Sequence, residues 1–131
     1  MRFTHALKGR LAIILVAMGL FLGLGGIAYA SSVDFGYTLP GYQENVTLKS
    51  GTRASSSSGA GVNVTRNDNN KKFWLWCDAP SVNTRVTNSV LVTGKNYYTL
   101  SYWTRGSGNV HLRGCTDGWQ EPNYVAGNVS F

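Results

Sequence analysis

The chain has 131 residues, and its 12 Lys and Arg against 6 Asp and Glu give a formal net charge of +6 at pH 7. This length corresponds to one domain rather than several. Beyond the first 30 residues the chain holds two cysteines and one histidine, His111, whereas a typical zinc site needs four such ligands. We therefore expect no metal and no cofactor.

The N-terminal 30 residues have the pattern of an export signal. Residues 1–10 hold three basic residues and no acid, residues 11–28 hold no charge, and "AYA" precedes two serines. This pattern predicts a signal peptide over 1–30 with cleavage after Ala30. The protein would then be secreted or held at the cell surface, and would meet the membrane only transiently through this segment. An uncleaved anchor is the alternative, because about 18 apolar residues lie near the lower limit for a span.

The remaining residues, 31–131, carry a smaller charge than the whole chain. Three of the 12 basic residues belong to the predicted signal, so nine basic residues face six acids and the net charge is near +3. Such a charge is ordinary for a soluble domain. Because Lys71 and Lys72 form the only run of basic residues there, we expect no nucleic-acid partner.

Residues 31–131 have a β pattern from start to end. Apolar and polar residues alternate in short segments, and Gly, Asn, Asp and Ser cluster between them. Residues 51–61, "GTRASSSSGAG", predict a loop or a weak edge strand. The strands expected in chain order lie within 33–39, 45–50, 62–66, 71–77, 84–93, 97–104, 110–115 and 123–131, with turns at 67–70, 94–96, 105–109 and 116–118.

The fold class follows from this spacing. No window has the i, i+3, i+4 apolar spacing of a helix, and seven to nine short strands are separated by turns every 8–12 residues. We predict a single all-β domain over 31–131, an antiparallel β-sandwich of the jelly-roll or immunoglobulin-like kind.

Cys77 and Cys115 both lie in the part predicted to be exported. An even pair of cysteines outside the cell favours one disulfide. A redox pair is the weaker alternative, because neither cysteine is in a C-x-x-C motif. We therefore predict a Cys77–Cys115 bond.

The segment "KKFWLWC" raises the question of which side chains face the core. Alternation along a strand puts Phe73, Leu75 and Cys77 on one face and Trp74 and Trp76 on the other. If Cys77 points inward, both tryptophans point outward. An exposed aromatic patch suits binding, for example to sugar rings. The alternative is that these rings are core, because tryptophan is highly buried on average.

The segment 97–104 repeats the same alternation. Its stripe of Tyr98, Leu100 and Tyr102 is expected to face the core, which leaves Tyr97 and Trp103 more exposed. We predict a binding surface formed by Trp74 and Trp76 together with Tyr97 or Trp103.

The acidic residues give little support for an enzyme. A Cys77–Cys115 bond would bring Asp78 and Asp117 near each other, with Glu121 nearby, and paired carboxylates can hydrolyse glycosides. Both aspartates lie in segments that predict turns, where Asp caps its own backbone. His111 lies within a strand without a G-x-S-x-G motif, so a serine triad is not expected either. We predict a protein that is not an enzyme.

The segments "FWLWC", "GKNYYTLSYW" and "YVAGNVSF" resemble those of small exported proteins of Gram-positive bacteria, catalogued as a domain of unknown function. The resemblance spans most of residues 31–131. It implies export and a β fold, and it assigns no site residues.

These observations favour an exported, non-catalytic binding or interaction protein. Its expected partner is a cell-wall polysaccharide or another surface protein. A dedicated carbohydrate or cell-wall binding module is the first alternative, and a secreted antimicrobial protein is the second. A small hydrolase is the least supported hypothesis.

Overall fold

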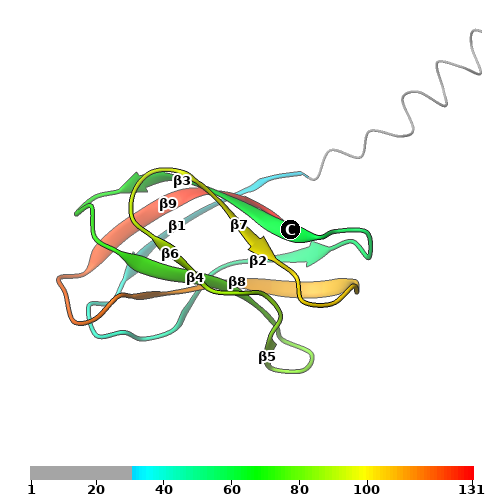
Figure 1. The fold of residues 1–131 in the computed structure, drawn as a ribbon. Helices are drawn as coiled ribbons and strands as arrows, with labels where there is room; N and C mark the ends of the chain where they lie inside the picture. The colour runs from blue at the N-terminus through cyan, green and yellow to red at the C-terminus, as the bar shows by residue number, and fades with distance from the viewer. Residues whose placement is uncertain (1–30) are drawn as a thin grey trace, which may run out of the picture. The chain divides into compact units, whose positions relative to one another are not determined.

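Nine β-strands and no α-helix make up residues 31–131, the part of the chain that this computed structural model describes (Figure 1). The predicted signal peptide over 1–30 lies outside the described residues. Within 31–131, no helix is long and apolar enough to cross a membrane. The strands are β1 (Val33–Leu39), β2 (Val46–Arg53), β3 (Gly59–Asn67), β4 (Phe73–Ala79), β5 (Thr84–Arg85), β6 (Val90–Val92), β7 (Tyr97–Ser101), β8 (Gly108–Thr116) and β9 (Asn123–Ser130).

The strands form two antiparallel sheets. The four-stranded sheet has the order β1-β9-β3-β7, and the five-stranded sheet has the order β2-β8-β4-β5, with β6 also paired to β4. In Figure 1, β3, β9 and β1 lie above β4 and β8. The pairing is nested along the chain: β1 pairs with β9, β2 with β8, β3 with β7, and β4 with β5 and β6. The predicted all-β antiparallel class is confirmed, and the two sheets are consistent with a sandwich.

The core forms from the alternate side chains that each strand turns inward. Phe73, Leu75 and Cys77 are fully buried in β4, and Leu100 is fully buried in β7, as the alternation predicted. Removing these apolar side chains from water is the main force that holds the domain together. The buried cluster comprises Phe35, Leu39, Val46, Leu48, Ala60, Val62, Val64, Phe73, Leu75, Cys77, Val92, Leu100, Leu112, Val125 and Val129.

The predicted disulfide between Cys77 and Cys115 is wrong, because both cysteines are free. Cys115 lies opposite Trp74 in the β4–β8 pairing, whereas Cys77 lies three residues further along β4, opposite Leu112. Three residues of strand span about 10 Å, and bonded cysteines need Cα atoms within about 7 Å of each other. The odd offset also puts the two thiols on opposite faces of the sheet. Cys77 is in the core, and Cys115 is half-buried on the outer face.

The segment 51–61 differs from the predicted loop or edge strand. β2 continues to Arg53 and β3 begins at Gly59, so only residues 54–58 form the loop. β3 lies between β9 and β7, inside its sheet. A side chain at Gly61 would collide with the ring of Tyr97, which crosses over this position. The glycine that suggested a loop in the sequence therefore makes room for an aromatic ring on a central strand.

The predicted strand over 84–93 is divided into β5 and β6. Between them, Thr87 pairs with Tyr102 of the other sheet's edge, so the chain bridges the two sheets here. The Thr87 hydroxyl accepts a hydrogen bond from the Cys77 backbone N–H and donates one to the Asn88 carbonyl, each at 2.8 Å. This side chain is fully buried, and both bonds satisfy it there.

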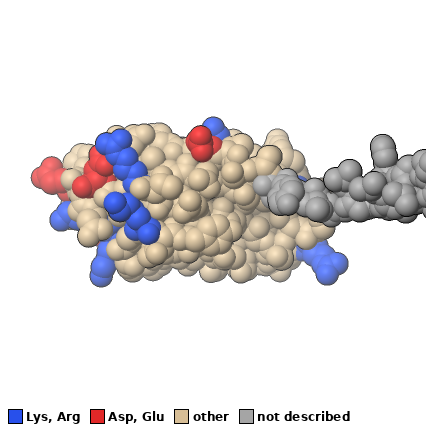
Figure 2. Space-filling view, turned by 90° about the horizontal axis from the view of Figure 1, so that it is seen from above, with Lys and Arg blue, Asp and Glu red and all other residues tan. Residues whose placement is uncertain are grey.

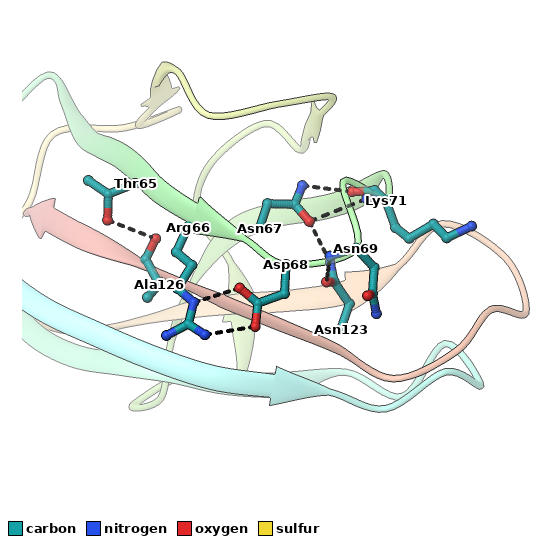
Figure 3. Close-up of polar contacts among 8 residues, drawn as sticks. All are labelled: Thr65, Arg66, Asn67, Asp68, Asn69, Lys71, Asn123 and Ala126. Atoms are coloured by element: carbon teal, nitrogen blue, oxygen red, sulfur yellow. Dashed lines mark hydrogen bonds and ion pairs between the residues drawn. The ribbon is translucent and has the colours of Figure 1, made fainter.

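The turn from β3 to β4 is held by buried amides (Figure 3). Asn123 donates to the Asn67 side-chain carbonyl at 2.7 Å and accepts from the Asn69 backbone N–H at 3.0 Å. Asn67 in turn donates to the Lys71 carbonyl at 2.9 Å. Asn70 has a φ of 49°, the left-handed conformation that asparagine tolerates in turns. The predicted turn at 67–70 is present, and Asn123 of β9 fixes it.

Candidate binding site

Trp74 and Trp76 lie on the outer face of the five-stranded sheet, opposite to the core set of β4. They are not equally exposed. Trp76 is only 3% exposed, and Trp74 is half-buried. The Arg85 guanidinium covers Trp76, with its carbon 4.7 Å from the centroid of the indole ring. The expected exposed pair is therefore one accessible ring beside one covered ring.

The covering arginine is held from two sides. Its Nη1 donates to the Ser89 hydroxyl at 2.6 Å, and its guanidinium stacks on the indole of Trp76. A cation over an aromatic face is stabilised by about 0.5–2 kcal/mol, more when water is excluded. Arg85 and Ser89 come from β5 and the segment before β6, so the divided strand supplies one wall of the site.

A groove of about 360 Å³ opens beside these rings. This volume lies in the range of small-ligand sites, at its lower end. The lining mixes indole surface with hydrogen-bonding groups from four separate segments. Its residues are Asn45, Trp74, Trp76, Arg85, Ser89 and Cys115.

Arg113 does not line the groove, but it holds the rim residue Asn45 in place. It lies opposite Trp76 on β8, donates to the Thr47 hydroxyl, and donates to the Asn45 carbonyl at 3.4 Å. Its Nε lies 3.4 Å from a carboxylate oxygen of Asp78. These contacts tie β2, β8 and β4 together and hold Asn45 at the rim.

The accessible indole is fixed at its polar end. Nε1 of Trp74 donates to the Asp117 carboxylate at 3.1 Å. Asp117 follows β8 at the end where β4 begins, and this bond restrains the orientation of the Trp74 ring. A ring held in one orientation loses little further freedom when a ligand packs on it.

Asp78 and Asp117 are not brought together. Asp78 is part of β4, opposite His111, rather than in the predicted turn. Asp117 follows Thr116, which lies opposite Phe73 at the other end of β4. The proximity expected from a disulfide is therefore absent, and each carboxylate contacts a different neighbour, Arg113 or Trp74.

The thiol of Cys115 lines the groove without the features of a nucleophile. Burial is the largest influence on the pKa of this thiol and raises it, while the positive charge of Arg85 lowers the pKa to a smaller degree. The thiol is then protonated at neutral pH, and the thiolate is the reactive form of cysteine.

The other two predicted aromatic residues lie elsewhere. Tyr97 is 67% exposed on the outer face of the four-stranded sheet, the opposite side of the molecule from the groove. Figure 2 shows the molecule from above, with charged side chains gathered mainly toward one end. Trp103 is 62% exposed just after β7, and its backbone N–H donates to the Val86 carbonyl. Tyr97 therefore lies on another face than Trp74 and Trp76, and Trp103 lines a different pocket from theirs.

Sequence reasoning missed the polar residues in the groove and beside it. Arg113 alternates with the core residues Leu112 and Gly114 of β8, so its outward direction was readable from the pattern. The position of Arg85 over Trp76 was not readable, because it depends on the division of the segment 84–93.

A second exposed aromatic pair was also missed. Tyr42 and Trp119 come from the β1–β2 and β8–β9 connections, with ring centroids 6.3 Å apart. Trp119 is 82% exposed and follows Gly118, which has a φ of 80°. The turn "TDGW" was a usable signal, because a tryptophan at a turn tip has little to pack against.

The described residues 31–131 hold no group of three or more His, Cys, Asp or Glu able to bind a metal ion. Comparison with family models, with curated proteins and with solved structures gives no match.

Proposed function

We propose that this chain is an exported, non-catalytic binding protein, and that the groove beside Trp74 binds a neutral saccharide of the cell wall or cell surface. The observation that carries the proposal is an oriented, half-buried indole in a groove rimmed by hydrogen-bonding groups. Export itself rests on the sequence pattern of residues 1–30.

The chemistry of the lining favours a sugar over a purely apolar ligand. The face of an indole packs against the C–H surface of a sugar ring. Asn45 offers a side-chain amide, and Ser89 and Arg85 offer donors to ring hydroxyls. A volume of about 360 Å³ suits one or two sugar rings, so a short stretch of polysaccharide is the expected occupant.

Two features support a binding role rather than hydrolysis. Glycoside hydrolysis needs two carboxylates about 5–10 Å apart across the bond. Asp78 and Asp117 lie near opposite ends of β4, and Asp78 forms an ion pair with Arg113. The pKa of the groove's one thiol is raised, which disfavours a nucleophilic role.

For the fold, we propose a jelly roll rather than an immunoglobulin-like sandwich. The support is the nested pairing: β1 pairs with β9, β2 with β8, β3 with β7, and β4 with β5 and β6. A long antiparallel hairpin rolled into two sheets gives this order. On this reading β5 and β6 are two pieces of one strand beside β4.

The test is a titration of purified residues 31–131 with soluble cell-wall oligosaccharides, followed by tryptophan fluorescence and calorimetry. We expect Trp74→Ala to weaken binding about tenfold or more, because the stacking surface is lost. Trp119→Ala is the matched control, since Trp119 is more exposed but lies outside the groove. Equal affinity of wild type and Trp74→Ala would contradict the proposal, as would a lack of binding across the panel.

A further inference from the structure

A second pocket lies at one end of the two sheets, away from the groove. The loop 54–58 joins β2 to β3, and residues 102–107 join β7 to β8; in Figure 1 both connections lie at the right-hand end. Arg53 pairs with Gly108 and Gly59 pairs with Ser101, so the strand pairing brings the two loops to the same end. Residues 56–58 and 102–105 line a pocket of about 260 Å³. None of them lines the groove.

A buried cation lies directly behind this pocket. Arg53 is 8% exposed, and its guanidinium carbon lies 4.3 Å from the centroid of the Tyr102 ring. Its Nη1 donates to the Thr104 carbonyl at 3.2 Å. Tyr102 and Thr104 both line the pocket, so the charge is held one layer below its surface.

This cation has no acidic partner within residues 31–131, where the ion pairs are Arg66 with Asp68 and Arg113 with Asp78. A buried charge normally requires a paired charge, because leaving water is costly. The loop closes tightly around the guanidinium: a side chain at Gly106 would come within 2.6 Å of Nη2 of Arg53. The fold thus keeps an unneutralised positive charge at this end.

The pocket's own lining completes an anion site. Arg105 is exposed at its edge and adds a second positive charge, and the three serines of residues 56–58 bring hydroxyl donors. Guanidinium and hydroxyl groups bind carboxylate and phosphate oxygens with charge-assisted hydrogen bonds. Trp103 adds an exposed indole face for the uncharged part of a ligand.

We propose that this pocket binds an acidic monosaccharide unit. Its carboxylate or phosphate contacts Arg105 and is attracted by the positive charge of Arg53 behind the pocket, and its ring packs on Trp103. This inference goes beyond the proposed function, because it concerns a different surface and a charged ligand. An acidic polysaccharide could supply such a unit through either anionic group.

The experiment is an amide chemical-shift titration of residues 31–131 at low salt with glucuronate, glucose 6-phosphate and neutral glucose. We expect saturable shifts in residues 56–58 and 102–105 with at least one of the two anions at about 10 mM or below, and none with glucose. The anion that binds identifies carboxylate or phosphate as the recognised group. Raising salt from about 50 to about 200 mM should weaken this binding.

Arg105→Gln should weaken binding about fivefold or more. Lys95→Gln is the matched control, since it removes an equal exposed charge from the β6–β7 turn and should leave binding unchanged. Arg53→Lys keeps the buried charge and should retain part of the binding; if that variant does not fold, the Arg105 comparison still decides. Trp74→Ala should bind the anion as wild type does, which separates this pocket from the groove.

Three results would overturn the inference: no saturable shift with either anion, equal shifts with neutral glucose, or equal weakening in Arg105→Gln and Lys95→Gln. None of these results bears on saccharide binding in the groove, because the two sites share no residue.

Discussion

Cys77 ends the row of side chains that β4 turns into the core. Burial, and to a lesser degree the charge of Asp78, raises the pKa of its thiol to about 12 from an ordinary value of 9.0. The folded protein therefore keeps this proton at a pH where the unfolded chain has released it. The free energy of unfolding is then fully retained below pH 9.0 and falls as the pH rises from there toward 12.

We predict that the free energy of unfolding falls between pH 9 and pH 10, with a slope from Cys77 of up to about 1.4 kcal/mol per pH unit. Cys77→Ala should flatten this slope, although it also lowers stability at every pH by leaving a small cavity. Denaturant unfolding at several pH values measures both. Cys115→Ser is the control and should keep most of the slope, and an unchanged slope in Cys77→Ala would contradict the account.

The two thiols should also differ in accessibility. Cys115 is half-buried at the groove and Cys77 is enclosed in the core. We predict that a thiol reagent labels Cys115 slowly in the native protein and labels Cys77 only after unfolding. Mass spectrometry of labelled, non-reduced protein distinguishes the two sites. A protein with no labelled thiol even when unfolded would show that the cysteines are bonded.

The strand β4 is covered on both faces at Trp76. Its inner face packs in the core, while on its outer face Trp76 is covered by Arg85. We predict that Trp76→Ala lowers the free energy of unfolding by about 3–5 kcal/mol, on the scale of other buried tryptophans. Trp74→Ala is the matched variant two residues away and should cost clearly less, because part of this ring already contacts water. Equal losses in denaturant unfolding would argue against the difference in burial.

The β3–β4 turn depends on one side chain from β9. Asn123→Ala removes the donor to the buried Asn67 side chain and the acceptor for the Asn69 N–H, and leaves Asn67 Oδ1 only the longer bond from the Lys71 N–H at 3.3 Å. We predict a loss of about 1–3 kcal/mol in the free energy of unfolding. Asn128→Ala, on the same strand but its outer face, should change stability by less than about 0.5 kcal/mol. Similar losses in both variants would contradict the assigned role.

The strands were predictable where local pattern decides them. Alternation in 33–39 and around Phe73 and Leu75 located β1 and the core face of β4, because the pleat has a period of two. The pattern did not predict that Arg85 covers Trp76. The position of Arg85 depends on the interruption of the strand at Thr87, where the chain pairs with the other sheet. The ends of β2 and β3 were missed because glycine and serine indicate loops, whereas Gly61 accommodates the ring of Tyr97.

The predicted disulfide is wrong, and Tyr97 does not lie beside Trp74, for a related reason. Both required knowledge of how strands align, and residue order along one strand does not contain it. The β4–β8 register separates Cys77 from Cys115, and the order of the two sheets separates Tyr97 from Trp74.

At the scale of the whole molecule, the groove is assembled from distant parts of the chain. Asn45 precedes β2, Trp74 belongs to β4, Arg85 to β5 and Cys115 to β8. A ligand in this groove binds only the folded chain and therefore stabilises it by mass action. We predict that a bound oligosaccharide at about 100 times its Kd raises the free energy of unfolding by about 2.7 kcal/mol. Thermal melts with and without ligand measure this, and an unchanged Tm at saturation would contradict the prediction.

Our proposal requires that a saccharide bind on the outer face of the five-stranded sheet. The most direct measurement is an amide and indole N–H chemical-shift titration of residues 31–131 with a neutral cell-wall oligosaccharide. The account predicts the largest shifts at the indole N–H of Trp74 and in the backbone around Asn45, Ser89 and Cys115, with loss of these shifts in Trp74→Ala. Shifts confined to the Tyr42 and Trp119 pair, or to the four-stranded sheet around Tyr97, would contradict it.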